Sequence, residues 1–149
     1  YIQSPYFIPD ESVMDALKMA ILSGIDVRIM VPNKPDHIFV YWATYSFIGE
    51  LAELGAKTYI YENGFIHTKM IIIDDELSSL GSANFDYRSF KLNFELNAFM
   101  YDDKTTKEFR NIFLNDIEKS TLISFSKYQQ RSLLIKIKEA FARLISPIL

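Results

Sequence analysis

The residues best suited to chemistry in this chain lie in two short segments, one before residue 70 and one after residue 81. His67 and Lys69 are two positions apart in the first, and Ser82 and Asn84 are two positions apart in the second. Lysine offers a compact positive charge, whereas serine and asparagine offer neutral hydrogen-bond donors. Such groups can hold the oxygens of a phosphate and stabilise the charge that grows there. Histidine, which titrates near neutrality, can act as nucleophile or as general acid.

A catalytic histidine works best when a carboxylate on its second ring nitrogen fixes the tautomer. Glu95 is the candidate, because it lies near the start of an apolar run, residues 94–101, that is typical of a buried strand. A carboxylate in such a strand needs a polar partner. The chain has no cysteine and only two histidines, thirty residues apart, so we predict no metal site.

Three apolar runs in the first half of the chain predict strands, namely residues 1–7, 26–31 and 57–61. A helix that Asp10 caps and Gly24 ends separates the first two, and a helix over residues 37–54, ended by Gly55, separates the last two. This alternation predicts right-handed crossovers and a parallel core.

The second half predicts a hairpin followed by a strand and two helices. A strand over residues 65–73 would place the side chains of His67 and Lys69 on one face, and Asp74 would begin the turn to a short strand over residues 77–80. If this hairpin pairs in register, Ser82 and Asn84 reach the same site. The remaining elements are a strand over residues 94–101, a helix over 105–119 with Phe109, Ile112, Phe113 and Ile117 inward, and a final helix over 127–145. We therefore predict the α/β class, with a mixed sheet flanked by helices.

Charge is distributed unevenly along the chain. Residues 127–149 carry a net charge of +4, whereas residues 1–126 carry −7, so we expect no nucleic-acid partner. We divide the chain into a catalytic domain, residues 1–126, and a basic amphipathic helix, residues 127–149. That helix either covers the domain or lies on an anionic membrane surface. No run is long enough to span a membrane. We interpret the chain, which begins in an apparent strand, as a fragment of a longer protein.

The spacing His-x-Lys-x4-Asp-x6-Gly-Ser-x-Asn, from His67 to Asn84, resembles the catalytic motif of the phospholipase D superfamily at every fixed position. The stretches 1–10, 37–43, 88–95 and 142–149 further resemble the C-terminal half of bacterial cardiolipin synthases. The resemblance implies a phospholipase D-like sandwich that forms one half of a two-lobed enzyme. It also implies that Lys69, Ser82 and Asn84 bind the phosphate and that Glu95 orients His67. Asp74 is the third letter of the catalytic motif, with a role that is more structural than chemical.

The resemblance implies phosphatidyl transfer between two phosphatidylglycerol molecules, which gives cardiolipin and glycerol through a phosphohistidine, without metal or organic cofactor. It implies an anionic phospholipid substrate, a membrane partner, and a location on the cytoplasmic side of a bacterial cell membrane. Lipid hydrolysis and nucleic-acid hydrolysis by a dimeric nuclease are the alternative activities.

Members of this superfamily combine two such motifs, whereas this chain has one. His67 is therefore either nucleophile or general acid, and the C-terminal position of its motif favours general acid–base catalysis. The resemblance implies that the isolated chain is inactive without the N-terminal half or a second copy. A non-catalytic half-domain is the remaining alternative.

Overall fold

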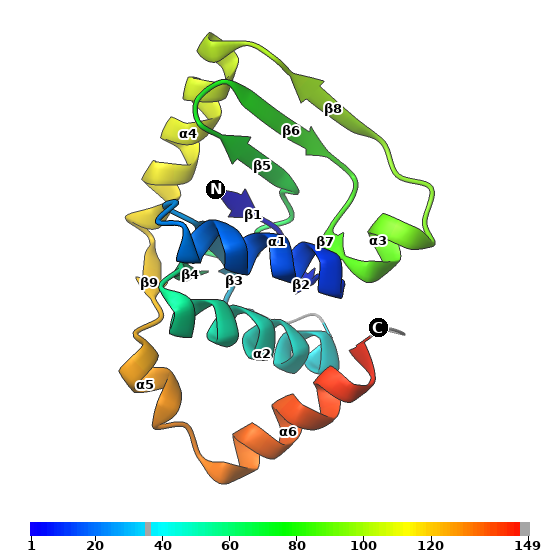
Figure 1. The fold of residues 1–149 in the computed structure, drawn as a ribbon, viewed down its shortest axis with the longest axis vertical. Coiled ribbons are helices and arrows are strands. Elements are labelled where there is room, and N and C mark those ends of the chain that lie inside the picture. The colour runs from blue at the N-terminus through cyan, green and yellow to red at the C-terminus, as the bar shows by residue number, and fades with distance from the viewer. Residues whose placement is uncertain (35–36, 147–149) are drawn as a thin grey trace.

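Seven strands of the described part of the chain, residues 1–34 and 37–146 of this computed structural model, form the main sheet. Their bounds are β1 Ile2–Gln3, β3 Arg28–Pro32, β4 Lys57–Tyr61, β5 Met70–Ile73, β6 Leu77–Gly81, β8 Asn97–Met100 and β9 Ser120–Leu122. Their order is β8-β6-β5-β1-β3-β4-β9 (Figure 1). The β1–β3 and β3–β4 pairs are parallel, and the outer pairs are antiparallel. The predicted mixed sheet with a parallel core is confirmed.

Helices cover both faces of this sheet, and their bounds are α1 Glu11–Leu22, α2 Ile38–Leu54, α3 Tyr87–Lys91, α4 Asp103–Ile117, α5 Phe125–Gln129 and α6 Leu133–Leu144. In Figure 1, α1 and α2 lie side by side in front of the sheet and α4 runs along its left side. Ile29 and Val31 of β3 pack in the core under α1 and α2, whereas Met30 packs with Phe113 of α4. This alternation follows from the period of two residues in a strand.

The predicted first strand, residues 1–7, is wrong as a single element. β1 belongs to the main sheet, whereas β2 (Phe7–Ile8) pairs in parallel with β7 (Phe85–Asp86) in a separate two-stranded sheet. Ser4 redirects the chain between them, since its Oγ donates to Tyr6 O at 2.7 Å and accepts from Phe85 N at 3.0 Å. Pro5, which has no N–H, also favours a break in the ladder.

The local signals at helix ends were read correctly. The Oδ1 atom of Asp10 accepts from Val13 N at 2.9 Å and caps α1, and Gly55 ends α2 with φ of +114°. In α4, Phe109, Phe113 and Ile117 face the sheet as predicted. Ile112 is exposed, so its predicted inward position is wrong. It directly precedes Phe113, and neighbouring residues of a helix point in different directions.

The single helix predicted over residues 127–145 is wrong, because the segment forms α5 and α6. Arg131 lies in the break, where its Nη1 donates to Tyr128 O at 2.8 Å and its Nε lies 2.7 Å from Glu139 Oε2. Ser132 then caps α6 by accepting from Ile135 N at 3.4 Å. The predicted boundary between residues 126 and 127 falls inside α5.

The α5 helix rests on α2 at a glycine. A Cβ atom on Gly49 would lie 1.9 Å from Cζ of Tyr128, so only glycine allows this ring to sit so close to α2. The α6 helix also packs on α2, with Glu139 and Ala142 buried (Figure 1).

The opposite side of α6 is apolar and exposed. We call this surface the α6 stripe, and it consists of Leu133, Leu134, Ile137, Phe141 and Leu144. In residues 1–34 and 37–146, no helix combines the length and apolar character that crossing a bilayer requires.

The other end of the sheet is also apolar and exposed. The side chains of Phe94, Leu96, Phe99 and Tyr101 are all more than half exposed, and we call this surface the open edge. It follows β8, the outermost strand at the upper right of Figure 1. The prediction of a buried strand over residues 94–101 is therefore wrong in its burial, and the strand itself covers only Asn97–Met100.

Candidate active site

The first motif segment reaches the sheet just before β5 begins. His67 and Lys69 lie ahead of Met70, so the strand predicted over residues 65–73 is too long by five residues at its start. Lys69 is buried, with 9% of the residue exposed, and its ammonium donates to His67 O at 2.8 Å. The imidazole of His67 is exposed and stacks on Phe65, with ring centroids 5.9 Å apart. The lysine charge is therefore fixed beside the histidine backbone.

The second motif segment is tied directly to the first. Gly81 N donates to Lys69 O at 3.2 Å, one step beyond the Met70–Leu80 pair of the hairpin. A Cβ atom on Gly81 would lie 2.2 Å from Leu96 O, so the glycine of the motif is required by close packing of the backbone. This contact brings the residues after Gly81 alongside Lys69.

Ser82 and Glu95 form one hydrogen-bonded unit. Ser82 Oγ donates to Glu95 Oε2 at 2.5 Å and accepts from Leu96 N at 2.9 Å. Asn93 Nδ2 donates to the other carboxylate oxygen at 3.0 Å. These two hydrogen bonds, first that of Ser82 and then that of Asn93, lower the pKa of Glu95, and the nearby Lys69 charge adds to the effect. Glu95 is therefore held as an ionised carboxylate by its hydrogen bonds, with a small contribution from the Lys69 charge.

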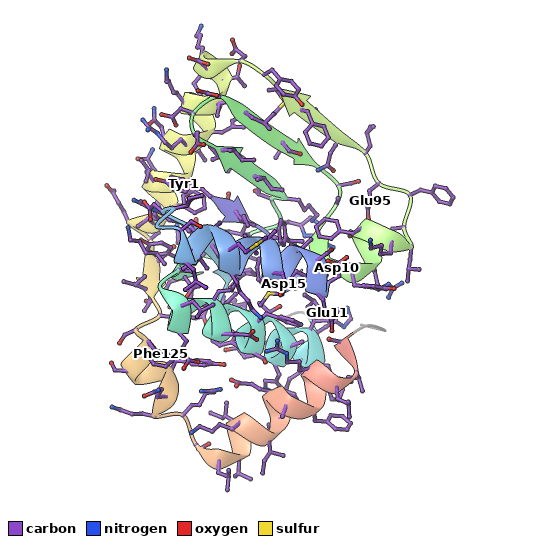
Figure 2. All side chains as sticks on the ribbon, in the orientation of Figure 1. Tyr1, Asp10, Glu11, Asp15, Glu95 and Phe125 are labelled. Carbon is purple, nitrogen blue, oxygen red and sulfur yellow. The ribbon has the colours of Figure 1, made fainter. Side chains whose placement is uncertain are left out.

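Glu95 itself lies in the loop between α3 and β8 rather than in a buried strand, as Figure 2 shows. Its side chain is half-buried. The apolar neighbours that predicted burial, Phe94 and Leu96, point into solvent at the open edge. The need of this carboxylate for polar partners was nevertheless read correctly, since Ser82 and Asn93 supply them.

Asn84 is held by its backbone, which leaves its carboxamide for other contacts. Its N–H donates to Ser89 Oγ at 3.1 Å, and Ser89 in turn donates its own N–H to Asp86 at the start of α3. In the described part of the chain, Asn84 Oδ1 is buried and has no hydrogen-bond partner. Buried polar atoms are normally paired, so an unpaired one at a candidate site favours a binding role.

Asp74 lies at the opposite end of β5 from the other motif residues. It occupies the turn between Ile73 and Leu77 with φ of +52°, and Asp75 follows with φ of +61°. The predicted turn is confirmed. Two positive φ angles are typical of a tight hairpin turn, in which aspartate is well tolerated. The motif therefore places Asp74 where it shapes the hairpin, a strand length away from Lys69.

The structure thus brings Lys69, Ser82 and Glu95 together and fixes the backbones of His67 and Asn84 beside them. Sequence reasoning missed two supporting residues, Ser89 and Asn93, whose types gave only the general signal of short polar side chains near Glu95. In the described residues, no cluster of three His, Cys, Asp or Glu side chains could hold a metal ion. One cation, one carboxylate and several neutral donors suit a phosphodiester with a histidine at its phosphorus.

Comparison with known proteins identifies the family to which this arrangement belongs. The family described as "Cardiolipin synthase, PLD-like domain" matches residues 1–117. The chain belongs to this family. The resemblance read from the spacing of His67 to Asn84 is confirmed.

Curated relatives are similar over the whole chain. Cardiolipin synthase of Listeria welshimeri is 58% identical over 149 residues, which cover 100% of this chain and 31% of that protein. The major cardiolipin synthase ClsA of Bacillus subtilis is 59% identical over 148 residues, with 99% and 31% covered. The chain therefore spans less than a third of the length of these relatives.

Solved structures with the same fold are more distant in sequence. Nuc, a phospholipase D family member from Salmonella typhimurium, matches with a TM-score of 0.70 at 21% identity, over 82% of this chain and 79% of that one. Phosphatidylserine synthase of Haemophilus influenzae matches with a TM-score of 0.75 at 17% identity, over 99% and 41%. At these identities the likeness concerns the fold, which is the predicted phospholipase D-like sandwich.

Proposed function

We propose that this chain is the C-terminal catalytic lobe of a cardiolipin synthase, which transfers a phosphatidyl group from one phosphatidylglycerol to another. The observation that carries the proposal is the contact between Gly81 N and Lys69 O, which joins the two halves of the motif. It makes one polar cluster out of residues separated in sequence. The curated relatives that match the whole chain are named cardiolipin synthases, which supports this choice within the superfamily.

Each polar residue has a role that follows from its chemistry. Lys69 and Asn84 bind the non-bridging oxygens of the phosphate, because one is a cation and the other a neutral donor. Ser82 belongs to the same phosphate site and also holds Glu95. Glu95, an ionised carboxylate, orients the imidazole of His67 during turnover. Asp74 acts on stability through the hairpin turn.

The reaction proceeds in two displacements. The histidine of a second motif attacks phosphorus, a P–N bond forms, and the P–O bond to glycerol breaks while His67 donates a proton to the glycerol oxygen. His67 then takes the proton from the terminal hydroxyl of a second phosphatidylglycerol. That oxygen attacks phosphorus, the P–N bond breaks, and cardiolipin leaves. Atoms balance as two phosphatidylglycerol giving one cardiolipin and one glycerol, without metal or organic cofactor.

The partner that supplies the second histidine is the remainder of the parent protein. The curated relatives are about three times as long as this chain, since the matched part covers 31% of them. The open edge is the surface that such a lobe would cover, because exposed aromatic side chains along an outer strand favour association. Glu95 lies among these residues, so covering the open edge would also shield the site from water.

The membrane is the second partner. The α6 stripe is apolar, and the segment that includes it carries an excess of positive charge. An apolar surface with basic residues around it suits the boundary of an anionic bilayer. We propose that α6 contacts the membrane through the α6 stripe, while its other side packs on α2 of the domain. The lobe would work on the cytoplasmic side of the cell membrane.

Product analysis of the full-length parent protein tests the proposed reaction. We expect vesicles of phosphatidylglycerol to yield cardiolipin and glycerol in equal amounts by mass spectrometry, and a folded Lys69→Ala variant to yield neither at a comparable rate. Phosphatidic acid as the main product would replace transfer by lipid hydrolysis. Cleavage of DNA or RNA with no lipid product would assign the fold to a nuclease. Residues 1–149 alone should give no product.

A further inference from the structure

We infer that the open cavity lined by α2, β4, β9, α5 and α6 takes one fatty acyl chain of the phospholipid substrate. The inference rests on the proposed function, which it deepens by assigning a place to the apolar part of the lipid. The phosphate cluster described above explains how a headgroup binds, but it leaves the acyl chains without a site.

The cavity has the size and the walls that an alkyl chain needs. Its volume is about 360 Å³, within the usual range for small-molecule sites. Its apolar wall is formed by Trp42, Tyr45, Ile60, Leu122, Ile123 and Ile135. Polar groups gather at one side, where Asn33 Nδ2 donates to Glu62 Oε2 at 2.6 Å and both residues are exposed. The wall is therefore mostly apolar, whereas the rim at Asn33 and Glu62 is open to water.

Arg131 and Glu139, which face this cavity, neutralise each other, whereas Glu62 lies at its exposed rim. Glu139 is 3% exposed, and its carboxylate lies 2.7 Å from Arg131 Nε. The Arg131 guanidinium also stacks over the ring of Tyr128 at 3.5 Å. Burial, followed by the Glu139 charge, raises the pKa of Tyr128 to about 12, so its phenol stays neutral. A bound alkyl chain would meet a paired, hydrogen-bonded wall rather than an isolated charge, which is compatible with an apolar ligand.

Aromatic residues shared between two neighbouring hollows relate this cavity to the catalytic histidine. Phe65 stacks on His67, and Phe65 also lines a narrow hollow of about 20 Å³ with Tyr41 and Tyr45. Tyr41 and Tyr45, whose ring centroids are 4.3 Å apart, line the larger cavity as well. Phe65, Tyr41 and Tyr45 therefore supply aromatic contacts between the phosphate site and the cavity, and rigid rings give apolar contact at a small entropic cost.

The cavity also adjoins the surface that we place against the bilayer. Ile135 lines it and is 42% exposed, and the next residue back on α6, Leu134, belongs to the α6 stripe and is 71% exposed. An acyl chain could therefore pass from the membrane into the cavity along α6, while the headgroup reaches Lys69.

Two substitutions on α6 form a matched test in the full-length protein. Ile135→Trp fills the cavity, whereas Leu134→Trp adds the same ring on the exposed stripe. We expect Ile135→Trp to lower kcat/KM about tenfold or more for phosphatidylglycerol with 18-carbon chains, and less than about twofold for 8-carbon chains. Leu134→Trp keeps the α6 stripe apolar, so it should change kcat/KM by the same factor for both chain lengths. Equal losses on both chain lengths in Ile135→Trp, or no difference between the two variants, would overturn the inference.

Photolabelling of the wild-type protein gives an answer that does not depend on a folded variant. Phosphatidylglycerol that carries a diazirine at the end of one acyl chain should label peptides containing residues 121–123 or 135–139. Labelling confined to other peptides would reject the cavity. Failure of the proposed function is distinguishable, because wild-type protein would then give no transfer product at any chain length.

Discussion

Two regions of this molecule use apolar residues in opposite ways. In the closed half, made of β1, β3 and β4 with α1, α2 and α4, apolar side chains such as Ile48 and Phe113 are fully buried. At the open edge, Phe94 is fully exposed and Leu96 is 82% exposed. The candidate site straddles the two, with Lys69 next to the closed half and Glu95 at the open edge. The difference indicates that one region stabilises the fold, whereas the other presents its apolar side chains to solvent.

The largest effect should come from removing either Lys69, which binds the phosphate in the proposed reaction, or His67, which acts as its acid–base group. Lys69→Ala and His67→Ala in the full-length protein should each lower turnover at least about 100-fold, the scale of losing a transition-state contact or an acid–base group. Steady-state assays of cardiolipin formation measure the loss. Lys107→Ala, which removes an exposed lysine of α4, is the control and should leave turnover unchanged. Wild-type turnover in a folded Lys69→Ala variant would contradict the phosphate-binding role.

Two leucines, one in the closed half and one at the open edge, test how much each region contributes to the stability of the fold. In residues 1–149, Leu51→Ala in α2 should lower the free energy of unfolding by about 2–5 kcal/mol, because it leaves a cavity in a fully buried position. Leu96→Ala at the open edge should change it by less than about 0.5 kcal/mol. Urea titration followed by circular dichroism measures both. Similar losses at the two positions would mean that the open edge is not a free surface of the isolated chain.

The hairpin turn should show a smaller effect that is separate from chemistry. Asp74 has φ of +52°, so Asp74→Ala should destabilise the chain by about 1–2 kcal/mol. Asp74→Gly should be no less stable than the wild type, because glycine adopts this conformation freely. Both variants should keep their turnover per folded molecule. A 100-fold loss of turnover in folded Asp74→Gly would instead assign Asp74 to the chemistry.

The smallest effect concerns the exposed ion pairs of Asp26 at the start of β3. Hydrogen bonds from Arg28 and then Lys57 lower the pKa of Asp26 from 3.8 to about 2. Because the folded pKa is the lower one, this stabilisation is complete above the ordinary value and disappears as the pH falls from about 4 to 2. Solvent screening keeps it below about 1 kcal/mol. Asp26→Asn should therefore flatten this part of the acid unfolding curve, and an unchanged curve would contradict the role of this ion pair.

Local signals predicted much of the closed half. Asp10 and Gly55 act at the helix ends where they were expected, and the alternation of strands and helices gave the parallel core. These features depend on residues near one another in sequence. The polar residues of the candidate site could also be picked out from the sequence, because the spacing of two residues within each motif segment is a local property.

Features that depend on tertiary contacts were predicted less well. The apolar run around β8 has the composition of a buried strand, and composition alone cannot say whether another lobe covers it. The break between α5 and α6 depends on the contact of Arg131 with Glu139, eight residues later. β5 starts only at Met70, after a turn in which Gly64 has φ of +115°. These errors come from contacts and turns that the hydrophobic pattern does not encode, whereas the break at Pro5 and the exposure of Ile112 could have been predicted from local geometry.

The close approach of Tyr128 to Gly49 has a further consequence for how the molecule tolerates change. A glycine inside a helix weakens it by about 1 kcal/mol relative to alanine, so replacement by alanine is a common way to make a protein more heat-resistant. Here the added methyl would collide with the outer end of the Tyr128 ring, which would have to swing away from α2. The gain in helix propensity at residue 49 would therefore be offset by the loss of the contact that seats α5 on α2.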